Sequence, residues 1–261
     1  MTPYRSALIT GASSGIGEAL AIALAAPGVT LHVSGRDQAR LDLVATACRN
    51  RGATVAPHVI DVRDATAMRA WITSAGPLGL VIANAGISAG SGAMTGEPSE
   101  TTRAILATNL DGALNTIFPA MAIMRRQPVE PDGWRGRIGV IASIAAFVAV
   151  PDSAAYSASK AAIDIWTVAS ARGARAEGIH LTSLCPGYIR TAMTARNRFP
   201  MPGLMEADRA AGVILRSIAA GRVRVAFPWW MALAARLSGL LPPRVLGMLL
   251  PDRSDPAGEK P

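Results

Sequence analysis

Short apolar runs alternate with longer helix-compatible stretches along most of this chain, and this alternation limits the possible folds more than any other feature. The apolar runs are nearly continuous, as expected of strands that are buried on both faces. Strands are predicted at 7–10, 30–35, 54–61, 78–86, 136–143, 179–187 and 222–227. Helices are predicted between them over about 15–26, 37–51, 64–75, 98–126 and 153–177.

Repeated strand–helix units with right-handed crossovers predict an α/β fold with a doubly wound, seven-stranded parallel sheet and helices on both faces. We find no domain boundary within residues 1–227, which are predicted to form one domain. Residues 228–253 are predicted to be an apolar extension of that domain, and residues 254–261 a flexible tail.

Composition excludes several other classes of protein. Half of the residues are hydrophobic and 17% are charged, so the chain can bury a large core. A net charge of +8 would suit nucleic acid, but the arginines are scattered and no nucleic-acid-binding motif occurs, so no such partner is predicted. The cysteines Cys48 and Cys185 indicate neither a disulfide framework nor a metal site. The N-terminus does not resemble a secretory signal, and we expect a cytoplasmic protein.

A glycine-rich turn, Thr-Gly-Ala-Ser-Ser-Gly-Ile-Gly at 10–17, follows the first predicted strand and opens a helix. Glycines let the backbone turn sharply and approach a pyrophosphate closely, and the helix N-terminus adds free N–H groups and partial positive charge. This context predicts a dinucleotide site, with a purely structural turn as the alternative. The predicted cofactor-binding residues of the turn are Gly11, Ser13, Ser14, Gly15, Ile16 and Gly17.

The end of the second predicted strand bears on which dinucleotide binds. NAD sites commonly place an acidic residue there to bind the ribose hydroxyls. This chain has Gly35 at that position and Arg36 after it. A guanidinium suits a 2′-phosphate, so NADP(H) is favoured over NAD(H). The alternative is that Arg36 only decorates the start of a helix whose N-cap is Asp37.

Tyr156 and Lys160 lie four residues apart on a predicted helix and therefore share one face. A nearby ammonium stabilises tyrosinate, so we expect a lowered phenol pKa, as a proton donor to an alkoxide requires. Of the 26 lysines and arginines only Lys160 and Lys260 are lysines, which suggests that an amine is needed at position 160. Ser143 ends the fifth predicted strand, at the sheet edge where such folds bind ligands. A packing aromatic and a solvated lysine are the alternative.

Together with Ala-Asn-Ala-Gly at 83–86, Asn109 and Pro-Gly-Tyr-Ile-Arg-Thr at 186–191, these motifs resemble the short-chain dehydrogenase/reductase family over roughly residues 5–225. The resemblance implies a Rossmann enzyme that transfers a hydride between a nicotinamide and a carbonyl or secondary alcohol. Its catalytic residues would be Asn109, Ser143, Tyr156 and Lys160. Asn109 would help to hold a water in a proton relay from Lys160. The family often has asparagine where this chain has Ala83, so contacts of that side chain are expected to be lost.

The resemblance also implies further cofactor contacts, at the adenine, along the adenosine wall and around the nicotinamide, and it gives Tyr156 and Lys160 a share in cofactor binding. These residues are Asp61, Val62, Asn84, Gly86, Pro186, Gly187, Ile189 and Thr191. Members of the family commonly form dimers or tetramers, so a homodimer or homotetramer is expected.

In the family the segment after the sixth strand, here about 188–205, covers the substrate. The residues that follow Ser143 are apolar and could line the opposite wall, which predicts a hydrophobic ketone or acyl carbonyl as substrate. The predicted substrate residues are Ser143, Ala145, Phe147, Tyr188 and Met193. Whether the apolar ones are instead ordinary lid and core residues stays open.

The C-terminal extension is strongly apolar, with paired tryptophans and interspersed arginines. It could pack on a neighbouring subunit, or residues 228–250 could make peripheral membrane contact. It is too short, and too interrupted by Pro242 and Pro243, to span a bilayer. Two other functions are alternatives, a sugar-nucleotide epimerase or dehydratase and a catalytically idle cofactor-binding regulator or scaffold. Both are disfavoured, the first by the glycine spacing and the second by the complete catalytic set.

Overall fold

A computed structural model describes residues 4–88, 97–150, 153–197, 199–242 and 244–245. Its centre is a seven-stranded sheet, counted over the described residues, in the order β3-β2-β1-β4-β5-β6-β7. Every neighbouring pair is parallel. The strands are β1 (Ser6–Ile9), β2 (Thr30–Gly35), β3 (Thr54–Val59), β4 (Leu80–Ala83), β5 (Gly136–Ile141), β6 (Ile179–Pro186) and β7 (Arg224–Phe227). The predicted fold class is confirmed.

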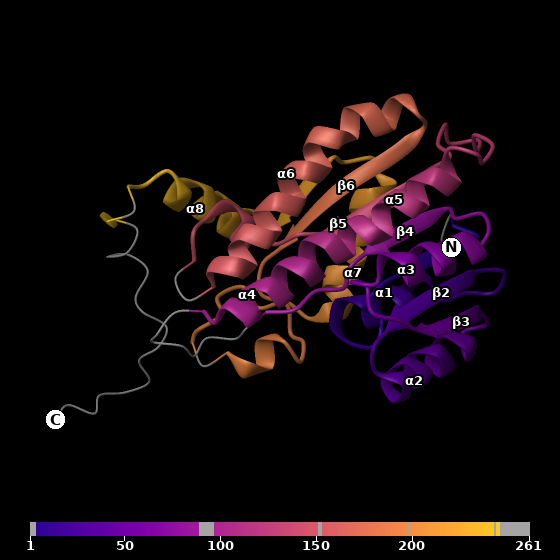
Figure 1. The fold of residues 1–261 in the computed structure, drawn as a ribbon, viewed down its shortest axis with the longest axis horizontal. Helices are drawn as coiled ribbons and strands as arrows, with labels where there is room; N and C mark the ends of the chain where they lie inside the picture. The colour runs from indigo at the N-terminus through magenta and orange to yellow at the C-terminus, as the bar shows by residue number, and fades with distance from the viewer. Residues whose placement is uncertain (1–3, 89–96, 151–152, 198, 243, 246–261) are drawn as a thin grey trace.

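Helices cover both faces of this sheet (Figure 1). They are α1 (Gly15–Leu24), α2 (Gln38–Arg49), α3 (Ala65–Ser74), α4 (Ser99–Leu106), α5 (Gly112–Met124), α6 (Ala154–Ala176), α7 (Ala207–Ala219) and α8 (Trp229–Gly239). The shorter helical turns are η1 (Ala107–Asp111), η2 (Ile144–Phe147) and η3 (Thr194–Arg196). The single helical stretch predicted over 98–126 is thus divided into α4 and α5 by η1, a π-helical turn.

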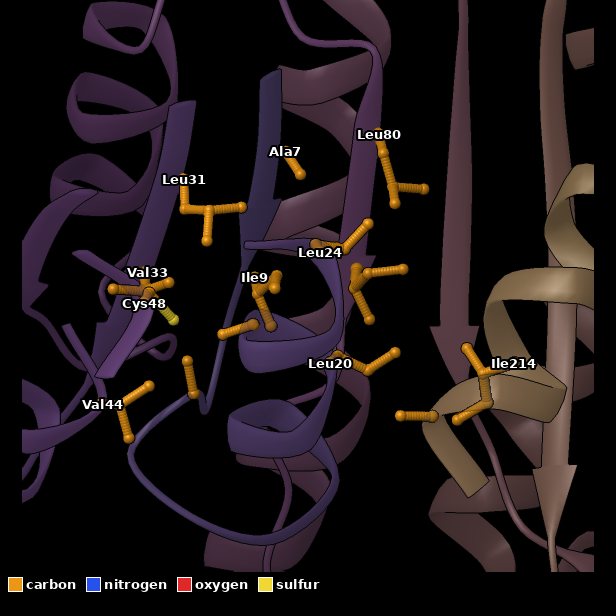
Figure 2. Packing of buried hydrophobic residues seen from close by; sticks show 14 of the residues in the cluster. Ala7, Ile9, Leu20, Leu24, Leu31, Val33, Val44, Cys48, Leu80 and Ile214 are labelled. Atoms are coloured by element: carbon orange, nitrogen blue, oxygen red, sulfur yellow. The ribbon is translucent and has the colours of Figure 1, made fainter. Parts of the chain in front are cut away.

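The alternation of side chains along each strand builds two cores. Ile9 of β1 faces the layer of α1, α2 and α7, whereas its neighbour Leu8 faces the layer of α3, α5 and α6. In Figure 2 the first core brings Leu20 and Leu24 of α1 close to β1, with Ile214 of α7 beyond them. Because both faces are buried, every position of a central strand must be apolar or small, which explains the continuous apolar runs in the sequence.

The strand order places a ligand crevice at the carboxyl ends of β1 and β4. The chain leaves β1 toward β2 on one side and resumes at β4 on the other, so the connections after these strands diverge. Doubly wound sheets bind ligands at such a switch point. The segment predicted as a strand over 78–86 ends at Ala83, and residues 84–86 beyond it line a cavity instead.

The C-terminal extension begins as a helix, α8, which packs against η2. Residues 246–253 of this extension and the tail predicted at 254–261 lie outside the described residues. Over the part of the chain that the structure describes, no helix combines the length and the apolar character that a membrane span requires.

Candidate active site

The glycine turn after β1 depends on two residues in the left-handed region. Gly11 has φ +65° and Gly15 has φ +61°, conformations that L side chains rarely adopt. A Cβ on Gly11 would lie 2.8 Å from the Cα of Ala85, and one on Gly17 would overlap the carbonyl oxygen of Gly11. Gly17 therefore packs beneath the turn, whereas Gly11 and Gly15 line the cavity in front of it.

Thr10 and Asn84 hold this turn against the end of β4. The Thr10 hydroxyl oxygen accepts hydrogen bonds from the backbone N–H groups of Asn84 at 3.0 Å and Ala85 at 3.2 Å. The Asn84 side-chain amide donates to the carbonyls of Thr10 at 2.9 Å and Gly11 at 3.1 Å. Asn84 thus fixes the turn as well as lining the cavity. Sequence reasoning missed Thr10, although a threonine ending a buried strand is a polar group that needs a partner.

One cavity of about 430 Å³ gathers nearly all the residues predicted to bind the cofactor. Of that predicted set, the residues lining it are Gly11, Ser13, Ser14, Gly15, Ile16, Arg36, Asp61, Val62, Asn84, Gly86, Tyr156, Lys160, Pro186, Gly187, Ile189 and Thr191. They come from the ends of several strands that are far apart in the sequence, and the cavity has the size of a ligand site. Ser143 also lines it.

One end of this cavity is rich in arginine. Arg36 and Arg40 line it beside Gly35, where a Cβ would lie 2.8 Å from the Ser13 hydroxyl oxygen. Asp37 is the N-cap of α2, since its carboxylate accepts from the Arg40 N–H at 3.0 Å. This agrees with the alternative role considered for Asp37, but Arg36 still reaches the cavity.

The Asp61 carboxylate, also at this end, is engaged by an arginine. Both of its oxygens accept hydrogen bonds from Arg63, at 2.6 to 3.0 Å. These hydrogen bonds hold the pKa of Asp61 below its usual value, and the charge of Arg36 adds to the effect. Asp61 is therefore ionised and balanced by its neighbours at neutral pH, and this end of the cavity stays favourable for an anion.

Tyr156 and Lys160 lie one turn apart on α6, as predicted, with the Lys160 Nζ 5.8 Å from the centre of the Tyr156 ring. Lys160 is buried, and its ammonium donates to the Ile141 carbonyl at 2.8 Å. Burial lowers the pKa of Lys160 to about 8. Burial also raises the pKa of Tyr156, while a hydrogen bond with Ser143 lowers it. The lowered phenol pKa expected from Lys160 is therefore not found, because desolvation of the phenolate outweighs the hydrogen bond with Ser143.

Asn109 lies in the π-helical turn and joins three segments behind the cavity. Its amide oxygen accepts from the Ile87 N–H at 2.8 Å, and its amide nitrogen donates to the Ile87 carbonyl at 3.0 Å. The same nitrogen donates to the Ser159 hydroxyl at 3.0 Å, and Ser159 donates to the Tyr156 carbonyl at 2.8 Å. A Cβ on Gly86 would lie 3.1 Å from the Asn109 amide oxygen and 3.4 Å from the Lys160 Nζ. Asn109 thus supports the start of α6, which carries the tyrosine, and Ser159 is a residue that sequence reasoning missed.

A second cavity, of about 370 Å³, adjoins the first. The two share Ser143, Tyr156, Gly187, Met193 and Thr194. Of the residues predicted to contact substrate, Ser143, Ala145, Tyr188 and Met193 line the second cavity. Phe147 is not among the residues that line this cavity; its ring lies under the guanidinium of Arg236, 4.5 Å away. Residues of α8 also form one wall of this cavity, which no sequence motif indicates.

The arrangement places two hydroxyl groups, on Ser143 and Tyr156, where the two cavities meet. The Ser143 hydroxyl oxygen accepts from the Ala145 N–H at 3.1 Å, and the Ser143 hydroxyl also hydrogen-bonds with Tyr156; a ligand oxygen that enters between the two hydroxyl groups can accept from both. A molecule in the second cavity can therefore meet two hydrogen-bond donors next to the first cavity. A metal site is not indicated, since no group of three or more potential ligands occurs in the described part of the chain.

Comparison with known proteins gives a consistent result. The sequence matches the family described as short chain dehydrogenase over residues 5–200. It is 37% identical to an uncharacterised oxidoreductase of Myxococcus xanthus over 243 residues, which is 92% of this chain and 93% of that protein. It is 31% identical to the ketoacyl reductase HetN of a Nostoc species, over 82% of this chain and 75% of that protein. A short-chain dehydrogenase from Sphingobium yanoikuyae, solved in complex with NADPH, is 25% identical with a TM-score of 0.77, over 90% and 94% of the two chains.

Proposed function

This chain belongs to the short-chain dehydrogenase/reductase family of oxidoreductases, and on that premise we propose that it uses NADP(H) to interconvert an apolar carbonyl compound and its alcohol. One observation carries the proposal. The cavity in front of the glycine turn and a second, mostly apolar cavity meet at Ser143 and Tyr156. A cofactor in the first and a substrate in the second would come together at these hydroxyl groups.

The first cavity fits a nicotinamide dinucleotide. The glycine turn leaves no room for a Cβ at Gly11, and the N-terminus of α1 offers unpaired N–H groups to a pyrophosphate. Arg36 and Arg40 would hold a 2′-phosphate. Gly35 stands where an acidic side chain would repel that phosphate, and its missing side chain leaves space for Ser13. The NADPH bound to the Sphingobium relative is in keeping with this choice. When bound, the nicotinamide supplies or accepts the hydride.

Tyr156 would give the proton to the carbonyl oxygen during reduction. Burial raises the pKa of its phenol, so the hydroxyl stays protonated at neutral pH and can act as a donor. Ser143 would donate a hydrogen bond to the same oxygen and orient it. Lys160, with its pKa lowered to about 8, is poised to exchange a proton near neutral pH. Asn109 would keep the start of α6 in register through Ser159 and hold the relay water.

The test is the oxidation of NADPH and NADH, followed by absorbance, with a panel of ketones from small diketones to long-chain 3-oxoacyl thioesters. We expect turnover that prefers NADPH and falls by about 10²- to 10⁴-fold in Tyr156→Phe, the usual contribution of a general acid. Full turnover in Tyr156→Phe would exclude the assigned proton donor. Tight NADPH binding without turnover of any ketone would contradict the proposal and indicate a cofactor-binding regulator.

A second variant tests the choice of cofactor. Arg36→Ala should weaken NADPH binding by about tenfold to a hundredfold, the value of a hydrogen bond to a charged group, and should leave NADH binding nearly unchanged. Equal loss for both cofactors would show that Arg36 does not recognise a 2′-phosphate. Isothermal titration measures both constants without any need for a substrate.

A further inference from the structure

We propose that helix α8 sets the size of the substrate, and that the substrate is an uncharged carbonyl compound whose apolar part lies along one face of this helix. The proposal rests on the proposed function for the reaction at Ser143 and Tyr156. It adds a class of substrate and a structural element that limits it.

The face of α8 that lines the second cavity is continuous. It consists of Trp230, Met231, Ala234, Ala235 and Ser238. Their spacing, with steps of four residues from 230 to 234 to 238 and from 231 to 235, places them on one side of an α-helix. The large side chains lie at the start of this face, and the following positions carry alanine or serine. The small residues leave the space into which a chain can extend.

Close contacts fix this helix relative to the reacting hydroxyl groups. A Cβ on Gly239 would overlap the Phe147 carbonyl oxygen, so the end of α8 lies directly on η2. Ala232 and Ala235 pack with Ile144 in a small core of their own. Because η2 follows Ser143 immediately, the distance between Ser143 and the cavity face of α8 is set by packed atoms.

The start of α8 is fixed in the same way. A Cβ on Gly187 would lie 2.8 Å from the Met231 sulfur. A Cβ on Gly203, which has φ +70°, would lie 2.9 Å from the Trp230 ring. Both glycines belong to the connection from β6 to α7, so this connection packs directly against the start of α8. Substrate size is thereby limited at a defined position.

The chemistry of the cavity wall indicates an uncharged ligand. The chain has 26 lysines and arginines, yet among the described residues that line this cavity none carries a charge. Its polar side chains carry hydroxyl groups, as Ser153 and Thr194 do, the amide of Asn197 or the indole N–H of Trp230, and all of them are neutral. An ionised group moved from water into such a place loses its hydration without gaining a partner. A keto acid of matched length should therefore be a poorer substrate than the neutral ketone.

Ala234 is the best position for a test, because it is solvent-exposed at the edge of the cavity and a larger residue there need not disturb the core. Ala234→Trp should block the path along α8. The matched control is Leu233→Trp, the adjacent residue on the same helix, which is 49% exposed and does not line the cavity. If Ala234→Trp fails to fold, Ser238→Leu obstructs the same face one turn later.

The measurement is kcat/KM for NADPH-dependent reduction of a series of 2-alkanones of increasing chain length. In the parent protein each methylene that lies on α8 should raise kcat/KM about fourfold, the value of one buried methylene. Ala234→Trp should lower kcat/KM for the long ketones at least tenfold more than for the shortest, and Leu233→Trp should follow the parent. An unchanged chain-length profile in Ala234→Trp, or the same loss in Leu233→Trp, would overturn the role of α8.

Two further arms separate the failure of this inference from failure of the proposed function. Displacement of Nile red, a neutral apolar dye, by 2-undecanone measures occupancy of the cavity without turnover. Displacement from the parent but not from Ala234→Trp, in a protein that reduces no ketone, would support the α8 site while refuting the reaction. A 2-oxo acid reduced as well as the 2-alkanone of equal length would overturn the uncharged class.

Discussion

Replacing Thr10 by valine tests whether one buried hydroxyl group holds the glycine turn to the rest of the sheet. Thr10 is 1% exposed, and valine has nearly its shape. On hydrophobicity alone the change should be neutral or stabilising, since it removes a polar atom from a buried position. The structure indicates the opposite, because the Thr10 oxygen accepts hydrogen bonds from two backbone N–H groups.

The magnitude follows from those two donors. Valine would leave the N–H groups of Asn84 and Ala85 without their acceptor, and each buried donor left unsatisfied costs about 1–3 kcal/mol. Both residues border the cofactor cavity, where water can partly replace the lost oxygen, so the lower half of this range applies. We expect Thr10→Val to lower the free energy of unfolding by about 2–4 kcal/mol. For a domain of this size that corresponds to a fall in Tm of about 4–16 °C.

Urea unfolding followed by tryptophan fluorescence gives the free energy, provided that the slope of the transition is unchanged. Thr10→Ser is the matched control, because it keeps the hydroxyl and removes a methyl group worth about 1 kcal/mol. Thr10→Val should therefore be the less stable of the two variants, and it should also bind NADPH more weakly because Asn84 loses its backbone anchor. A valine variant as stable as the parent, or more stable than the serine variant, would refute the reasoning.

Two other predictions concern buried charges on α6. Burial lowers the pKa of Lys160 from 10.5 to about 8, so the unfolded chain binds this proton more tightly and stability from this group rises with pH between about 8 and 10.5. Lys160→Met should lack this rise, so its free energy of unfolding relative to that of the parent should fall by about 3 kcal/mol from pH 7 to 11. The same pH dependence in both proteins, measured by urea unfolding, would contradict the lowered pKa. Arg224 pairs at 2.8 Å with Asp164, whose side chain is 3% exposed against 33% for the arginine. Arg224→Met leaves the buried carboxylate without its counter-charge, although Ser183 still donates to it at 2.6 Å, and should cost about 3–5 kcal/mol. Asp164→Asn should cost clearly less, and equal losses in urea unfolding would show that the carboxylate reaches water.

The fold could be predicted from the sequence because strands that are buried on both faces consist of nearly continuous apolar residues. The segment 30–35 was predicted with the same bounds as β2. The segment 78–86 was predicted too long, since β4 covers only Leu80–Ala83 and Asn84 leaves the sheet to bind the turn after β1. Periodicity reports which residues are buried, and it cannot distinguish burial in a strand from burial against a neighbouring loop.

The candidate site divides in the same way. The residues that line the first cavity follow from local motifs, because the sequence spacing of a glycine turn, or of a tyrosine–lysine pair on a helix, determines its local geometry. The contacts that support them join distant segments, as Asn109 does with Ile87 and Ser159. Spacing along the sequence does not predict a contact between distant segments. The π-helical turn that carries Asn109 also has no distinct apolar period by which it could be predicted. The sequence therefore predicted Asn109 only through a family resemblance.

The wall formed by α8 was beyond prediction for a further physical reason. An apolar C-terminal helix suits a subunit interface, a membrane surface and a cavity wall equally well, since each removes apolar surface from water. In the structure the helix divides its faces, with Met231 and Ala235 turned to the cavity and core and Trp229 and Leu240 left 74% and 82% exposed. Only the first face can affect substrate size. A change of chain-length preference in Ala234→Trp, with none in Leu233→Trp, would therefore assign the two faces separate roles.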